Sequence, residues 1–214
     1  MNLSVEVISD VICPWCYIGK RRLEKAIAAH DGPVKVRWLP YQLNPTMPKE
    51  GISRKEYRTK KFGTWERSQE LDARVVAVGQ EEGIHFAFDR IERTPNTLDA
   101  HRLIWLAEKQ GVQDAVVEAL FRAYFTEGRD ISNRQVLIDV VADAGLDRHQ
   151  AEAVLNSDDV LQAIKEADEQ ARRFRVEGVP FFIVNGRLTL SGAQQPDVFF
   201  EAFKQAIETR QTAK

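Results

Sequence analysis

The chain has 214 residues, a length that leaves open one domain with an insertion or two small domains. Hydrophobic residues make up 43% and charged residues 29%, and no apolar run approaches the roughly 18 residues of a spanning helix, which excludes a disordered or membrane-spanning chain. A net charge of −2 provides no basic surface for nucleic acid, so we expect neither nucleic-acid nor membrane partners. The N-terminus starts at Met1 and shows no export signal, so we expect a cytoplasmic protein.

A strand, a helix and a second strand are predicted at the start of the chain. Residues 3–9 are rich in valine and isoleucine, as short strands are. Pro14 stands where the first turn of a helix tolerates proline, which predicts a helix to about Ala29. Residues 34–40 alternate apolar and polar side chains, as a half-buried strand does. Such a unit usually joins two parallel strands through a right-handed crossover.

From about Ile52 to Arg175 the strand signals vanish and apolar residues recur on single helical faces. This segment has no fixed repeat and no low-complexity linker, so it is interpreted as a packed insertion of five or six helices. Two expected helix starts have the spacing of a capping box, Ser53 with Glu56 and Ser132 with Gln135. Three glycines mark expected helix ends: Gly83, Gly111 and Gly145.

Strand character returns after Gly178. Two short apolar runs flank Asn185-Gly186, the strongest short-range hairpin signal, and a last helix is predicted to begin at Pro196. The two ends of the chain therefore supply four strands and two helices of an α/β fold, and the helical block interrupts it. We expect one discontinuous domain from residues 1–45 and 176–214, and a helical insertion domain from residues 46–175.

The chain has two cysteines, Cys13 and Cys16, placed three positions apart at the predicted helix start. The free backbone N–H groups and the dipole of a helix start favour thiolate over thiol, which makes Cys13 the candidate nucleophile. Cys16, one turn further, is placed to attack a mixed disulfide on Cys13 and release the substrate. A zinc site lacks ligands, because the four histidines are scattered, and a structural disulfide would close too small a loop to stabilise much.

Three ordered motifs carry a family resemblance that spans essentially the whole chain. CPWC after a strand, a long helical insertion, and GVP at 178–180 before a hairpin resemble the DsbA-type branch of the thioredoxin superfamily. Within that branch, SDVICPWCYIGKRRLE, PNTLDAHRL at 95–103 and VEGVPFFIVNGRLTLSGAQ at 176–194 resemble FrnE-like dithiol oxidoreductases. The resemblance implies a thioredoxin-like α/β fold with a large all-helical insertion.

The same resemblance implies a thiol-disulfide oxidoreductase that acts on disulfides or thiols of proteins or small molecules. It implies no metal and no tightly bound cofactor, and it makes glutathione a candidate co-substrate. The protein is expected to be a monomer or a homodimer.

Several further positions become candidate site residues through the resemblance. Pro180 is expected to follow a cis peptide bond beside the dithiol, with the Val179 backbone offered to an extended substrate. Ser191 and Gly192 would form a loop where glutathione-binding relatives hold the γ-glutamyl end. The remaining candidates for substrate contact are Pro14 and Trp15, the latter expected to be exposed, and Asn96, Thr97 and His101 in the PNTLDAHRL motif.

The sequence departs from the family in one respect. Thioredoxin and DsbA proteins generally carry a buried acid six positions before the first cysteine, where this chain has Val7. Glu6 would take that place only with a loop one residue longer. Asp10 is the other candidate for moving the Cys16 proton, although its loop position favours an exposed side chain.

Two rival functions remain open. The chain also resembles 2-hydroxychromene-2-carboxylate isomerases and kappa-class glutathione transferases, which share this architecture and use glutathione without a dithiol. Those relatives usually have serine where Cys13 stands, so the two cysteines favour redox chemistry. A non-catalytic binding module would have no need for Cys16.

Overall fold

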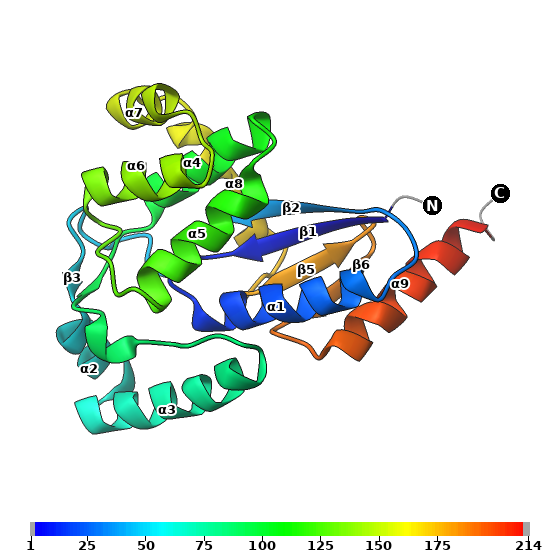
Figure 1. Ribbon diagram of the computed structural model, residues 1–214, viewed down its shortest axis with the longest axis horizontal. Helices are drawn as coiled ribbons and strands as arrows, with labels where there is room; N and C mark the ends of the chain where they lie inside the picture. Colours follow the sequence, from blue (N-terminus) through cyan, green and yellow to red (C-terminus); the bar gives the residue numbers. More distant parts are fainter. Residues whose placement is uncertain (1–2, 212–214) are drawn as a thin grey trace.

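The computed structural model describes residues 3–211 and contains a four-stranded sheet with helices on both faces. The strands are β1 (Leu3–Ser9), β2 (Val34–Pro40), β5 (Phe181–Val184) and β6 (Leu188–Ser191), in the order β2-β1-β5-β6. Helices α1 (Pro14–Ala28) and α9 (Pro196–Gln211) lie side by side against one face (Figure 1). This is the thioredoxin-like α/β fold with a helical insertion that the sequence predicted.

The pairing follows the alternation of side chains along β1. Strand β1 runs parallel to β2, with Val5 opposite Val36, and antiparallel to β5, with Val7 opposite Phe182. Val5, Val7 and Phe182 are fully buried in the main core, beneath α1 and α9. The hairpin between β5 and β6 turns at Asn185-Gly186, whose φ angles of 49° and 68° are those that asparagine and glycine adopt most readily.

The helical insertion holds more elements than the sequence indicated. In the described residues it contains seven α-helices instead of five or six, a 3₁₀ turn and a small two-stranded sheet. The sheet was missed because its strands have two residues each, too few for alternation to appear. The elements are β3 (Ile52–Ser53), α2 (Arg54–Phe62), α3 (Trp65–Glu81), η1 (Phe88–Arg90), β4 (Arg93–Thr94), α4 (Leu98–Lys109), α5 (Gln113–Phe125), α6 (Arg134–Asp143), α7 (Arg148–Asn156) and α8 (Leu161–Arg173).

One of the two predicted helix starts is capped by the expected serine. Ser53 Oγ accepts a hydrogen bond from the Glu56 backbone N–H at the start of α2. At the start of α6 the prediction was wrong by one residue, because Asn133 caps the helix and Ser132 instead donates to the Glu50 carbonyl. The three glycines predicted at helix ends each follow the C-cap residue of a helix and have positive φ: Gly83 at 74°, Gly111 at 73° and Gly145 at 97°.

The insertion is attached to the sheet along the outer edge of β2. The Gln113 side chain accepts from the Trp38 backbone N–H at 2.9 Å and donates to the Trp38 carbonyl at 3.0 Å, as a neighbouring strand would. The Trp38 indole N–H also donates to Asp114, 3.0 Å away. These bonds satisfy edge groups that water would otherwise solvate. One main core runs through both parts of the chain, so the domain boundaries stay a prediction.

Within residues 3–211, no helix combines the length and the apolar character that crossing a bilayer requires.

Candidate active site

Cys13 is placed by the turn that leads from β1 into α1. Its backbone N–H donates to the Asp10 carbonyl, and its own carbonyl accepts from the Cys16 N–H, both at 3.0 Å. The helix begins at Pro14, so Cys13 is the N-cap residue and Cys16 lies within the first turn. The two sulfurs are therefore held on one turn, and both cysteines are free thiols.

The two thiols differ in environment. Cys16 is completely buried, whereas Cys13 keeps 5% of its surface exposed. The Cys13 thiol donates to the Val179 carbonyl, with 3.4 Å between sulfur and oxygen. Burial raises the pKa of the Cys16 thiol well above its ordinary value, and the hydrogen bond with Cys13 raises it further. Cys16 therefore stays protonated over a pH range in which an ordinary thiol ionises.

The segment around Pro180 faces the dithiol. The Val179–Pro180 peptide bond is cis, as the resemblance implied. The Pro180 carbonyl accepts from the Gly192 N–H at 2.8 Å, which ties the loop at Ser191 and Gly192 to this segment. Arg22 of α1 donates to the Ala193 carbonyl at 2.7 Å and so fixes the same loop to the helix that carries the cysteines.

Asp10 was expected to be an exposed loop residue, and this expectation was wrong. Its side chain is completely buried because the segment after β2 covers it: the Leu43 backbone N–H donates to Oδ2 at 2.7 Å. His101 Nε2 lies 3.4 Å from Oδ1 and 3.2 Å from the Tyr41 carbonyl. Glu6, by contrast, is partly exposed on the sheet and lies 3.5 Å from Arg37. The buried acid next to the cysteines is therefore Asp10. The hydrogen bond to its backbone lowers the pKa of Cys16, and its charge acts in the opposite direction.

The other residues of the PNTLDAHRL motif lie in different surroundings. Asn96 accepts from the Leu98 N–H and donates to the Met47 carbonyl, and it lines a separate hollow away from Cys13. Thr97 is buried at the start of α4. Of the three motif residues proposed for the substrate site, the structure brings His101 to the dithiol region, through Asp10.

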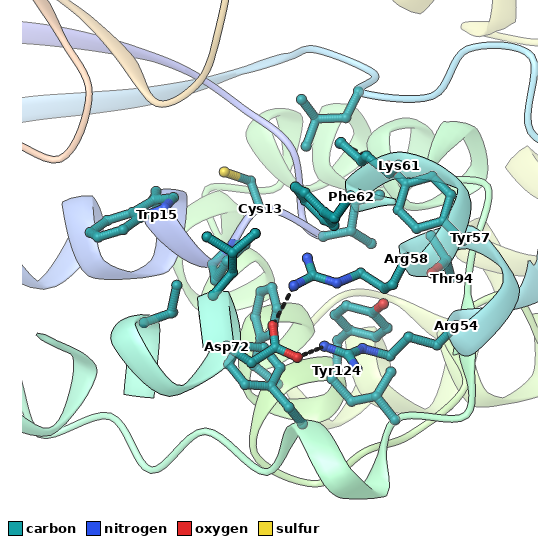
Figure 2. Close-up of a pocket in the computed structure, with 18 of the residues that line it drawn as sticks. Cys13, Trp15, Arg54, Tyr57, Arg58, Lys61, Phe62, Asp72, Thr94 and Tyr124 are labelled. Atoms are coloured by element: carbon teal, nitrogen blue, oxygen red, sulfur yellow. Dashed lines mark hydrogen bonds and ion pairs between the residues drawn. The ribbon is translucent and has the colours of Figure 1, made fainter. Parts of the chain in front are cut away.

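A pocket opens beside Cys13, between the start of α1 and helices α2 and α3 (Figure 2). Pro14 and Trp15 line it, and Trp15 is 40% exposed, in line with the exposed aromatic side chain expected there. Sequence reasoning missed the polar groups opposite. Arg54 and Arg58 have the i, i+4 spacing of one helical face, but nothing in the sequence indicated that Asp72, on another helix, meets them.

The fold and the site define a class. A cysteine pair at the start of the first helix of a thioredoxin-like fold, facing a cis-proline segment, is the arrangement of thiol-disulfide oxidoreductases. The model of the DSBA-like thioredoxin domain family matches residues 4–204. The chain therefore belongs to the DsbA-like thioredoxin-domain family and carries its CXXC pair as Cys13 and Cys16.

Individual relatives resemble the chain over most of its length. Over 206 residues the chain is 28% identical to the uncharacterized protein YwbO of Bacillus subtilis, covering 94% of this chain and 96% of YwbO. The crystal structure of the probable DsbA oxidoreductase SCO1869 of Streptomyces coelicolor is 33% identical, with a TM-score of 0.88 over 96% of this chain and 90% of that one. The cytosolic disulfide reductase DsbM of Pseudomonas aeruginosa, solved with GSH, shares the fold. It is 24% identical, with a TM-score of 0.66 over 96% of this chain and 99% of DsbM.

Proposed function

We propose that this DsbA-like protein passes electrons between its Cys13–Cys16 dithiol and disulfides of proteins or small molecules, as a member of the FrnE-like branch. The observation that carries the proposal is the inequality of the two thiols: Cys13 borders a pocket, and Cys16 is sealed behind it. Only the first sulfur can meet a substrate, and only the second is placed to resolve the product.

The proposed cycle starts from the reduced protein. The Cys13 thiolate attacks one sulfur of the substrate disulfide, that S–S bond breaks, and the other substrate sulfur leaves as a thiolate. Cys16 then loses its proton and attacks the Cys13 sulfur, which breaks the mixed disulfide and releases the second substrate thiolate. Two electrons have passed to the substrate, and the protein holds a disulfide. The reverse sequence oxidises a dithiol.

The raised pKa of Cys16 makes its deprotonation the step that needs help. Asp10 is the buried carboxylate beside the cysteines. Its Oδ1 lies 3.4 Å from His101 Nε2 and accepts no hydrogen bond from the described residues. We assign the Cys16 proton to Asp10, whose Oδ2 is held in place by the hydrogen bond from the Leu43 N–H. The motif residue His101 lies beside Asp10, and Pro180 and the Val179 carbonyl border the sulfur that meets the substrate.

Glutathione is proposed as a co-substrate. The related DsbM was solved with GSH, and the loop at Ser191 and Gly192 is fixed to both Pro180 and α1. DsbM is described as cytosolic, which supports the proposal that this protein works in the cytoplasm. A monomer or a homodimer stays the expected state.

The test is disulfide reduction and dithiol oxidation with defined substrates, run beside a measurement of glutathione binding. Wild-type protein should catalyse both reactions, and Cys13→Ser should catalyse neither. Glutathione binding together with an activity that is indifferent to Cys16→Ser would instead indicate a glutathione-dependent isomerase or transferase. Binding without thiol reactivity would indicate a non-catalytic module.

A further inference from the structure

The pocket beside Cys13 is a concave cavity of about 390 Å³, a size that suits a small molecule. Its walls are mainly apolar and aromatic, including Trp15, Phe62 and Phe88. Cys13 lies on one side, and the guanidinium group of Arg58 lies across from it (Figure 2). A molecule that filled this space would touch the nucleophilic sulfur and a cation at the same time.

The polar floor of the pocket holds more positive than negative charge. Arg54 and Arg58 both donate to Asp72, one to each carboxylate oxygen, at 2.6 Å. Arg54 is buried, and Arg58 and Asp72 are largely so. Two guanidinium groups thus share a single carboxylate inside a low-dielectric wall. Burial lowers the pKa of Arg58; the charge of Asp72 opposes this effect, and the charge of Arg54 adds a smaller lowering of its own.

The rim of the pocket adds to the imbalance. Lys61 and Arg74 also line it, and Asp72 is the one acidic side chain among the lining residues that the structure describes. Lys61 donates to the Tyr57 hydroxyl at 2.9 Å, and within residues 3–211 neither Lys61 nor Arg74 forms an ion pair with a carboxylate. Four cations therefore face one carboxylate around the cavity.

We propose that this pocket selects low-molecular-weight disulfides or thiols that carry a carboxylate on an aromatic or apolar body. The body would fill the apolar walls, the carboxylate would pair with Arg58, and the sulfur would reach Cys13. An incoming anion would offset the cost of holding unbalanced charge away from water. This inference rests on the proposed function and names its substrate class.

The chemistry balances with the two protein thiols as reductant. Cys13 attacks one sulfur of an aryl disulfide, the aryl S–S bond breaks and one aryl thiolate leaves. Cys16 then displaces the second aryl thiolate from Cys13. Two aryl thiolates and two protons are released, and two electrons pass from the protein dithiol to the substrate.

The test compares two matched probes that differ only in charge: 5,5′-dithiobis(2-nitrobenzoate) and its neutral bis-amide. Reduced protein is mixed with each, and release of the coloured nitroaryl thiolate gives the rate constants. The ratio of the rate constants for the carboxylate and the amide probe is divided by the same ratio measured with free 2-mercaptoethanol. This normalisation corrects for the difference in intrinsic reactivity between the two probes. We expect a normalised preference of about tenfold for the carboxylate in wild-type protein.

Three variants locate the preference. Arg58→Gln should bring the normalised ratio close to one while leaving the Arg54–Asp72 pair intact, and Arg58→Lys should restore part of it. Arg67→Gln is the matched control, because Arg67 is an exposed cation of α3 that pairs with Glu70 and does not line the pocket. It should keep the wild-type ratio.

The outcomes separate this inference from the proposed function. If both probes are reduced and wild-type protein shows no preference, the substrate class is wrong and the redox function stands. A preference that survives Arg58→Gln but disappears in about 0.5 M NaCl would come from the surface field, and would overturn the role of the pocket. If the protein dithiol reduces neither probe, both proposals fail.

Discussion

The stability of the reduced protein should depend on pH through Cys16. This thiol is completely buried and its pKa is raised, so it stays protonated in the folded protein. In the unfolded chain it ionises above about pH 8.5, the ordinary pKa of a thiol. The folded state therefore binds more protons above that pH. The stabilising contribution is fully present below about pH 8.5 and is lost as the pH rises toward the folded pKa.

One proton that the folded state retains and the unfolded state releases gives a slope of up to about 1.4 kcal/mol per pH unit. Between pH 7.5 and 9.5 the free energy of unfolding of the reduced protein should therefore fall by about 1.4 kcal/mol on account of Cys16. Cys16→Ala removes this loss and leaves the other titrating groups in place. Tyr17 and Tyr124, whose pKa values are also raised, are common to both proteins and cancel.

The assay is urea unfolding of both proteins at the two pH values, with a reductant present throughout. The difference in unfolding free energy between wild type and Cys16→Ala should shrink by about 1.4 kcal/mol from pH 7.5 to 9.5. A difference that is the same at both pH values would show that Cys16 ionises alike in the folded and unfolded chains. That result would refute the argument from burial.

Other predictions concern the site and its support. Cys13 should be alkylated at a lower pH and faster than Cys16, and equal rates measured by mass spectrometry would contradict the division of roles. Asp10→Asn should slow resolution of the mixed disulfide by about tenfold or more while leaving the attack by Cys13 unchanged. Stopped-flow kinetics can measure the two steps separately, and equal slowing of both would indicate a structural role for Asp10. Burial acts to raise the pKa of Glu82, but hydrogen bonds from Lys25 and the buried Arg22 lower it overall. Glu82→Ala should therefore lower the free energy of unfolding at pH 7 by about 3 kcal/mol, a loss that shrinks as the pH falls through the folded pKa of Glu82; a change below about 1 kcal/mol in urea titrations would contradict this.

Local patterns predicted the elements that frame the site. The strand before Cys13, the helix opened by Pro14 and the hairpin at Asn185-Gly186 each depend on residues close in sequence, so their signals are complete within a short window. The cis bond before Pro180 has no such signal, and the family resemblance supplied it.

Burial of single polar side chains could not be predicted in this way. Asp10 stands in a loop, where exposure is the ordinary expectation, and it is buried because Leu43 and His101, distant in sequence, close over it. The charged floor of the pocket has the same cause, since Asp72 reaches Arg58 from a different helix. Tertiary contacts decided both outcomes.

In the proposed cycle Cys13 attacks and Cys16 resolves, so trapping the intermediate distinguishes the two sulfurs. Reduced Cys16→Ser protein is mixed with glutathione disulfide, quenched with acid and examined by mass spectrometry with peptide mapping. We expect a lasting glutathione adduct on Cys13 in the variant, and an internal Cys13–Cys16 disulfide without a lasting adduct in wild-type protein. Turnover by Cys16→Ser at the wild-type rate, or an adduct that persists equally in both proteins, would contradict it.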